Sequence, residues 1–368
     1  MTQSIQGTGE PIRHKILGPI PKELGLTNED IATLKNQLES TVCALRTWLQ
    51  WPLISGDHRA GDGREGAPDG LGREMTRFEH VERLAACDVC GSERLREVDA
   101  RAHVVECAEC GHRFVSPRPT QAAITAAYSD PHAYDHWLRE EEGRRRMWRK
   151  RLDLLEHQPA PGHRLLDVGA GIGTFLALAA ERGWQVAGTE ISESAVRLAR
   201  ERHGLELRPA QLEEAGFEAG SFDVITLWHV LEHVPSPRRT LLECHRLLVP
   251  GGLLVAATPN DSAAMVLPRR AKRLLQRLPY RRYEELLPGE EVHLSHFRPE
   301  TLQRLLRATG FQPLQVGVDD QYPRPTLLTD ARVLASRALA GAGLNLGNSL
   351  LAIARWIPLP AAVTSREC

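Results

Sequence analysis

The chain has 368 residues, a formal net charge of -1 and 42% hydrophobic residues, which is enough apolar material for two domains or for one large domain with additions. The near-zero charge argues against a protein that binds nucleic acid over much of its surface. The first residues lack the apolar core of a signal peptide and no apolar run has the length of a membrane span, so we expect a cytoplasmic protein without a transmembrane segment. Seven cysteines, four of them in two C-x-x-C pairs, favour a reducing compartment over a disulfide framework.

Residues 1–54 are predicted to form a helical extension. Thr27 is a candidate helix cap, and apolar residues then recur every three or four positions between Ile31 and Leu49. This stripe predicts a helix that packs on the protein's own core; the alternative is a dimerising helix, which would make the protein a homodimer. Residues 55–78 are rich in Gly, Asp and Arg and predict a flexible linker.

Two C-x-x-C-Gly sequences follow the linker, at residues 87–91 and 107–111. Each pair can bend so that both sulfurs face one point, and four thiolates make the closed tetrahedral site that is typical of structural zinc. We therefore predict a zinc ribbon over residues 79–120 with a hairpin between the pairs; its metal ligands are Cys87, Cys90, Cys107 and Cys110. A redox pair or ordinary core cysteines are the alternatives. Acidic residues outnumber basic ones in this segment, so nucleic acid is not an expected partner of the ribbon.

Residues 133–158 predict a charged helix with apolar residues among its cations. Residues 164–190 then predict a strand, a glycine-rich turn, a helix and a second strand that leads to Glu190. Glycines let the backbone approach a ligand, a helix N-terminus offers free N–H groups, and Glu190 could accept the hydroxyls of a ribose. The dinucleotide fingerprint requires Gly or Ala where this chain has Thr174, so the unit fits a different nucleoside-bearing cofactor.

The sequence DVGAGIG at residues 167–173, followed by Glu190, resembles motif I and the ribose acid of class I S-adenosylmethionine (SAM) methyltransferases. Residues 222–237 resemble the family's fourth strand and the helix after it, and residues 247–260 resemble its Pro-Gly-Gly turn and fifth strand. The resemblance covers residues 86–356. It implies a methyltransferase domain over residues 121–358, built as an α/β, Rossmann-like, doubly wound and mostly parallel sheet of seven strands, with a short third strand at residues 205–207.

The resemblance also implies the residues that bind SAM. The matching positions are Asp167, Gly169, Ala170, Gly171, Gly173, Glu190, Ile191 and Trp228. Gln211 and Leu212 fall where the family packs and hydrogen-bonds the adenine, although an Asp is frequent where this chain has Gln211.

His229 lies at the end of the predicted fourth strand, on the edge where open α/β sheets bind ligands, and we expect it to open the next helix, within one turn of Glu232 and His233. One interpretation is that Glu232 and His233 only fix the helix end and the wall of the cofactor cleft. Another is that His229 is a general base, because an imidazole with a pKa of about 6.5 can remove a proton near neutral pH. We take His229, His233 and His296 as candidate catalytic residues.

A third interpretation of the same stretch is a divalent metal. Ubiquinone-type O-methyltransferases and small-RNA 2′-O-methyltransferases resemble it but carry Glu-x-x-Glu-His, and His229 replaces the first of these glutamates. His293 or His296 would supply a further ligand.

Residues 261–297 form an insertion with many arginines interleaved with Leu and Tyr. A solvated basic helix is the simplest interpretation. In the resembled family an insertion here covers the acceptor, which would make it a basic lid for a phosphate-bearing acceptor such as a nucleotide sugar, or a contact with an anionic membrane surface that carries a lipid-linked one. Residues 311–318 and 348–356 are predicted to close the sheet as an antiparallel pair, and residues 359–368 form a tail.

The resemblance implies a transferase that moves the methyl group of SAM to a small-molecule acceptor. Because the ribbon runs into residues 114–120, it resembles the front end of bacterial methyltransferases of sugar, polysaccharide and natural-product pathways. An RNA methyltransferase guided by the ribbon and a non-catalytic SAM-binding module are the alternatives. The sequence leaves the acceptor and the methylated atom open.

Overall fold

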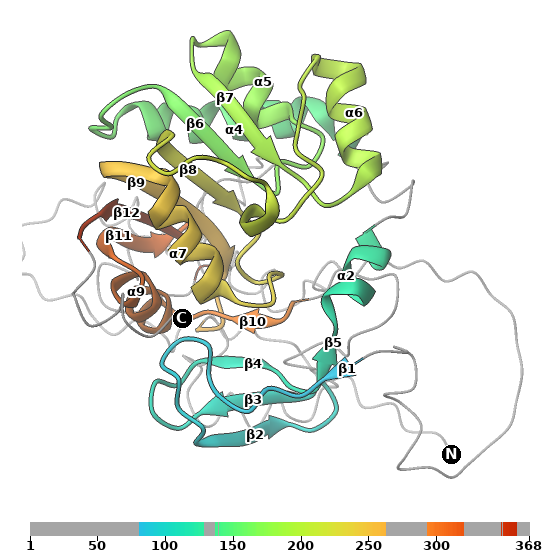
Figure 1. The fold of residues 1–368 in the computed structure, drawn as a ribbon, viewed down its shortest axis with the longest axis vertical. Coiled ribbons are helices and arrows are strands. Elements are labelled where there is room, and N and C mark those ends of the chain that lie inside the picture. The colour runs from blue at the N-terminus through green and yellow to red at the C-terminus, as the bar shows by residue number, and fades with distance from the viewer. Residues whose placement is uncertain are drawn as a thin grey trace, which may run out of the picture. The chain divides into compact units, whose positions relative to one another are not determined.

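The computed structural model describes residues 81–128, 137–138, 140–262, 293–319, 347 and 349–358 (Figure 1). The predicted helical extension (1–54), the linker (55–78), residues 263–292 of the insertion and the tail (359–368) lie outside the described residues, so these predictions stay untested. The described ranges all belong to one compact unit of the chain.

A six-stranded mixed sheet organises the described structure, with the strand order β11-β12-β9-β8-β6-β7. The parallel part consists of β6 (Arg164–Val168), β7 (Gln185–Thr189), β8 (Phe222–Trp228) and β9 (Leu248–Pro259). β12 (Ser349–Trp356) runs antiparallel to both β9 and β11 (Phe311–Val318). The predicted doubly wound, mostly parallel sheet and its closing antiparallel pair are therefore confirmed.

The prediction of a third strand at residues 205–207 is wrong, because none of these three residues belongs to a strand. The Leu205 amide turns back to the Ala199 carbonyl (3.3 Å) at the end of the preceding helix. Only Arg208 reaches β7, where it forms a single parallel bridge with Thr189. The described sheet consequently has six strands and a bridge at the seventh position.

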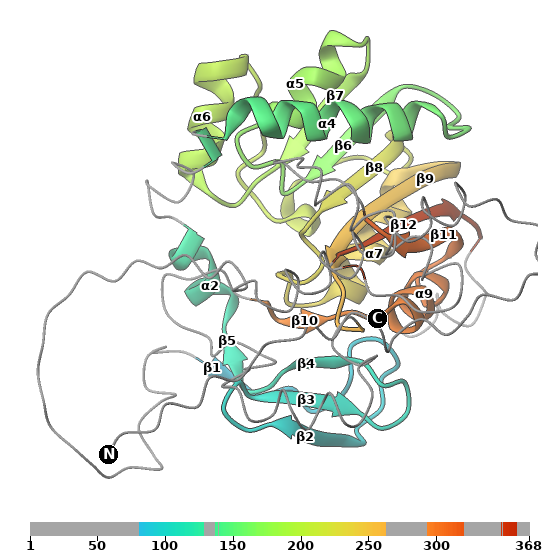
Figure 2. The ribbon, with the colours of Figure 1, turned by 180° about the vertical axis from the view of Figure 1, so that it is seen from behind.

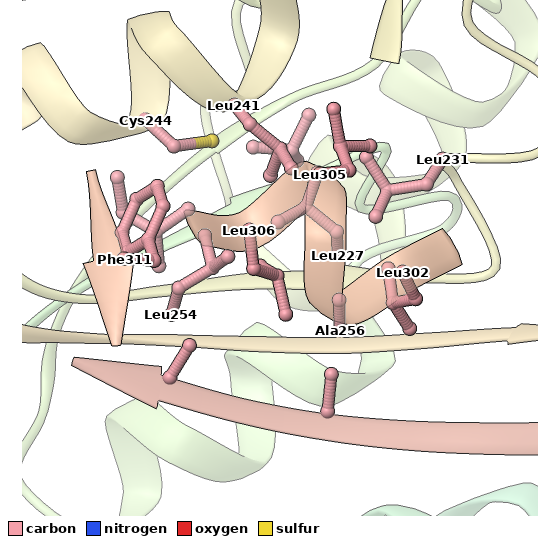
Figure 3. Packing of buried hydrophobic residues seen from close by; sticks show 14 of the residues in the cluster. Leu227, Leu231, Leu241, Cys244, Leu254, Ala256, Leu302, Leu305, Leu306 and Phe311 are labelled. Atoms are coloured by element: carbon pink, nitrogen blue, oxygen red, sulfur yellow. The ribbon is translucent and has the colours of Figure 1, made fainter. Parts of the chain in front are cut away.

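Helices cover both faces of the sheet (Figures 1 and 2). On one face lie α4 (Glu141–Glu156), α5 (Thr174–Glu181) and α6 (Glu193–His203). On the other lie α7 (Pro237–Leu247) and α9 (Pro299–Ala308), whose apolar residues pack on β9 and β12 as Figure 3 shows. Because successive strand residues point to opposite faces, neighbours such as Leu165 and Leu166 enter different hydrophobic clusters. None of the described helices has the length and apolar character needed to cross a membrane.

The ribbon is a small antiparallel sheet of β2 (Leu95–Asp99), β3 (Val104–Cys107) and β4 (Arg113–Val115). A fourth strand, β10 (Ser295–His296), pairs with β4 although it lies at the end of the insertion, far along the chain. β1 (Val81–Glu82) pairs separately with β5 (Arg118–Pro119), after which α2 (Gln121–Tyr128) begins. The predicted hairpin is present, but the sheet of the ribbon is completed by a strand from the methyltransferase segment.

Candidate cofactor and acceptor site

The glycine turn (residues 169–173) lies directly after β6, at the carboxyl edge of the sheet. Gly169, Gly171 and Gly173 have φ angles of 66°, 55° and 77°, a region that L side chains rarely adopt. A Cβ atom on Gly171 would lie 2.9 Å from the ring of Trp137, and one on Gly169 would lie 2.7 Å from Val230. The turn therefore requires glycine for both conformation and space, and it leads into the N-terminus of α5.

Glu190, the predicted ribose acid, is buried beside this turn. One carboxylate oxygen accepts the amide of Gly171 (2.8 Å) and the other accepts the amide of Ser192 (2.9 Å). Burial raises the pKa of Glu190, and these backbone N–H groups partly oppose the rise. The structure thus brings together the two ends of the predicted cofactor site.

Asp167 and Trp228 lie at the carboxyl ends of β6 and β8, as predicted, and both are buried. The hydroxyl of Thr226 donates to Asp167 (2.6 Å). Burial raises the pKa of Asp167 to about 7, although the Thr226 hydroxyl and the charge of Arg151 act in the opposite direction.

The structure adds Arg151 of α4 as a candidate site residue that the sequence alone did not indicate. Its guanidinium carbon lies 4.3 Å from the centroid of the Trp228 ring, and its Nη2 donates to Asp319 (2.7 Å). Within the described part of the chain, the Nε and Nη1 of Arg151 and the Nε1 of Trp228 are buried without a hydrogen-bond partner. Three donors thus face an edge of the sheet where open α/β folds bind ligands. The signal in the sequence was a cation on the apolar face of a helix, between Trp148 and Leu155.

The remaining predicted cofactor residues lie along the same edge. Leu212 is buried in the 3-10 turn η3 (Leu212–Glu214), and Gln211 precedes it. The Glu190 amide donates to the carbonyl of Arg208 (3.0 Å), which holds the loop before η3 beside the second strand. Ile191 and Ala170 flank Glu190 and Gly171 in the sequence. Their contacts with a bound cofactor stay predictions.

His229 has a φ angle of 58°, which is rare for a residue other than glycine. The structure corrects the predicted helix start here: residues 231–233 form a turn, because the left-handed His229 cannot begin a helix and α7 starts only after Pro235. The turn nevertheless places the Nδ1 of His229 3.3 Å from Oε1 of Glu232. The side chain of His229 is 41% exposed and that of Glu232 is 1% exposed, so the pair joins a buried carboxylate to an accessible imidazole.

Glu232 is held from several sides. The hydroxyl of Thr258 donates to its Oε2 (2.9 Å), and its backbone carbonyl accepts the amides of Leu294 (2.7 Å) and Ser295 (3.1 Å). Burial acts to raise the pKa of Glu232, but the hydrogen bond with His229 and the nearby histidines outweigh it and leave the pKa lowered. Glu232 is therefore a fixed carboxylate that can orient an imidazole.

The ligand-type atoms of Glu232, His233 and His293 all lie within 4.8 Å of one another. The rings of His233 and His293 have centroids 4.8 Å apart. One carboxylate and two imidazoles are donors that a divalent cation accepts, so the metal interpretation stays open. Within this group the further histidine is His293, whereas His296 belongs to β10.

The four ribbon cysteines form one cluster. The Sγ atoms of Cys87 and Cys110 are 3.6 Å apart and those of Cys90 and Cys107 are 3.5 Å apart. A disulfide has an S–S length of about 2.05 Å, whereas zinc with Zn–S bonds of about 2.3 Å sets its sulfurs roughly 3.8 Å apart. The cluster fits the second geometry and could hold a structural zinc.

A doubly wound sheet with a glycine turn after its first strand and an acid after its second defines a nucleoside-cofactor enzyme of the class I methyltransferase type. A protein-family model described as "Methyltransferase domain" matches residues 134–316. Together with relatives more than 30% identical, of which this chain spans more than two thirds, the match shows that the chain belongs to the SAM-dependent methyltransferases and is an enzyme that uses SAM. The sequence-based predictions of family, fold and cofactor are confirmed.

Curated relatives are ubiquinone biosynthesis O-methyltransferases. Those of Ralstonia nicotianae (34% identical) and Aromatoleum aromaticum (31%) match 45% of this chain, and the matches span 70% and 71% of those proteins. The protein of Hahella chejuensis is 42% identical over 30% of this chain, and the match spans about half of its length, 49%.

Solved structures of similar proteins include a SAM-dependent methyltransferase from Mesorhizobium loti. It is 24% identical to this chain and has a TM-score of 0.39; the match covers 55% of this chain and 95% of the Mesorhizobium loti chain. Another is a SAM-dependent methyltransferase from Thermotoga maritima, described as a possible histamine N-methyltransferase. It is 17% identical and has a TM-score of 0.42, and the match covers 64% of this chain and 100% of the Thermotoga maritima chain.

Proposed function

We propose that this enzyme methylates a hydroxyl oxygen of a small molecule, and that His229 removes the proton of that hydroxyl. The observation that carries the proposal is the His229–Glu232 pair at the end of β8, an accessible imidazole backed by a buried carboxylate. The matched relatives named O-methyltransferases support oxygen as the acceptor atom.

SAM supplies an electrophilic methyl group on a sulfonium. We assign the nucleoside end of its site to the glycine turn and Glu190, because each carboxylate oxygen keeps a lone pair that a ribose hydroxyl can use beside its present amide. Arg151 and Trp228 would receive the carboxylate of the methionine portion, since both have buried donors without a partner in the described chain. Asp167 lies close enough to offset the charge of Arg151.

His229 would act as a base through its second ring nitrogen. With a proton on Nδ1, the imidazole donates a hydrogen bond from Nδ1 to Glu232, which leaves Nε2 to accept the proton of the substrate hydroxyl. Glu232 is fixed by Thr258, so the imidazole has a defined orientation without a large entropic loss on reaction. The positive φ of His229 is strain of the kind that persists where the surrounding structure enforces it.

The acceptor class rests on sequence. Cations in the insertion favour a phosphate-bearing or lipid-linked acceptor from sugar, polysaccharide or natural-product chemistry, and this part of the proposal depends on residues outside the described ranges. The RNA alternative gains no support from the ribbon. Three of its arginines are bonded to carboxylates: Arg94 to Glu109, and both Arg96 and Arg113 to Glu106.

Variant His229→Asn tests the proposal, because asparagine tolerates a left-handed backbone better than alanine and cannot act as this base. With methyl-labelled SAM and a panel of phenols, sugars and nucleotide sugars, we expect turnover to fall about a hundredfold or more while S-adenosylhomocysteine affinity changes little. His157→Asn, at the exposed end of α4, is the matched control. Wild-type turnover by His229→Asn would reject His229 as the base.

A further inference from the structure

Strand β10 connects the ribbon to the candidate acceptor site. On one side it pairs with β4, with Ser295 opposite Phe114 and His296 opposite Arg113. At its start, the amides of Leu294 and Ser295 both donate to the carbonyl of Glu232. Figures 1 and 2 show this short strand between the ribbon sheet and the rest of the chain. The backbone that carries His293 and His296 is therefore held between the ribbon and Glu232.

A buried charge cluster lies beside this strand. The Nε of Arg113 donates to Glu106 of β3 (2.7 Å), and its Nη1 donates to Asp261 (2.8 Å), just after β9. Arg298 lies 3.7 Å from Glu106 and 3.9 Å from Asp261. With Arg96, which also bonds to Glu106, three cations thus meet two carboxylates. The side chain of Arg113 is only 8% exposed, so its removal would leave buried carboxylates poorly compensated.

Apolar packing and a helix cap strengthen the same junction. The ring of His112 packs against Phe114 and against Phe297, with centroids 5.7 Å and 5.2 Å away. Asp88, between the first two cysteines, accepts the hydroxyl of Ser236 (2.6 Å) and the amide of Arg238 (2.8 Å) at the start of α7. Buried apolar residues of the ribbon belong to the same hydrophobic cluster as those of α7 and α9.

We propose that the ribbon is a positioning element of the methyltransferase. Arg113 is its key positioning residue: through β4 and Asp261 it fixes residues 293–296 against Glu232, and so sets the place of His293. Among the described contacts, none joins Asp167, the glycine turn or Glu190 to this junction. That the place of His293 matters for the acceptor rests on the proposed function, but the readouts that test this positioning require no turnover.

The experiment compares Arg113→Met with Arg96→Met. Both variants remove a cation bonded to Glu106. The Arg96 side chain, however, is 68% exposed, and among the described ion pairs Asp261 is bonded to Arg113 and not to Arg96. Readouts are hydrogen exchange of the Leu294 and Ser295 amides, the ring ¹⁵N signals of His293, zinc content and S-adenosylhomocysteine affinity. We expect Arg113→Met to speed exchange at least tenfold and to shift the His293 signals, with zinc content and affinity within twofold of wild type. Arg113→Lys should restore part of the protection, and Arg96→Met should change none of the readouts.

Equal exchange rates and equal His293 signals in the two methionine variants would overturn the proposal. So would a parallel loss of S-adenosylhomocysteine affinity, because the effect would then be global. If Arg113→Met does not fold, Asp261→Asn removes the negative charge of the same ion pair from the other side with little change of shape, and the same outcomes decide. A failure of His229 as the base would appear in turnover and leave these readouts unchanged.

Discussion

Replacing Arg151 with methionine would separate two effects of one buried guanidinium. The side chain of Arg151 is 3% exposed and that of its partner Asp319 is 1% exposed. Removing the cation leaves Asp319 buried and poorly compensated, a change that typically costs about 3–5 kcal/mol of folding stability. We therefore expect Arg151→Met to lower the urea midpoint strongly. The double variant Arg151→Met/Asp319→Asn should recover most of that loss.

The double variant then isolates cofactor binding. A charge-assisted hydrogen bond contributes about 1.5–3 kcal/mol, so losing the proposed contact with the methionine carboxylate should weaken S-adenosylhomocysteine binding roughly 10- to 100-fold. 5′-Methylthioadenosine lacks that carboxylate and should bind the double variant and the wild type equally in calorimetry. Wild-type affinity of the double variant for S-adenosylhomocysteine would refute the assignment of Arg151. An equal loss for both ligands would show that the nucleoside end of the site had been disturbed instead.

Two further predictions concern metal and pH. Protein purified without chelator should contain one zinc per chain, and Cys90→Ser should lose it, because three thiolates no longer close the tetrahedron; elemental analysis that finds no zinc in the wild type would contradict this. Asp167 has a folded pKa raised from 3.8 to about 7, so its contribution favours the folded state below pH 4 and is lost as the pH rises through 7. Urea unfolding should therefore show that Asp167→Asn gains stability relative to wild type between pH 4 and 8, by as much as about 4 kcal/mol; a pH-independent difference would exclude Asp167 as the cause.

The parts of the site that the sequence predicted are those encoded locally. Spacing alone brings Cys87 and Cys90 to one point, and a positive φ at Gly171 and Gly173 follows from a turn that only glycine tolerates. Glu190 could be placed because a helix and a strand of ordinary length separate it from the turn. In each case the relevant distance in space follows from a short distance in the chain.

The missed features depend on contacts between remote segments. Arg151 lies in a run of cations, and only the fold shows that it turns inward to meet Asp319. The pairing of β10 with β4 joins the end of the insertion to the ribbon, about 180 residues earlier in the chain, and no periodicity in a two-residue strand could predict it. His229 has a left-handed backbone between β8 and α7, which begins only at Pro237. A helix was predicted there because the spacing of His229, Glu232 and His233 alone is helical.

The base and metal interpretations compete for the same atom. Oε1 of Glu232 lies 3.3 Å from Nδ1 of His229 and 3.8 Å from Nε2 of His233. A divalent cation bound by Glu232, His233 and His293 would compete with the imidazole of His229 for this oxygen, which is the acceptor that orients the Nε2 of His229 toward a substrate. Oε2 is already bonded to Thr258, so the cation and the imidazole would share Oε1, and the charge of the cation would weaken the hydrogen bond that this oxygen accepts from His229. A second metal equivalent that disappears in His293→Ala but persists in Cys90→Ser would therefore count against His229 as the base, whereas zinc in the cysteine cluster alone leaves the carboxylate to the imidazole.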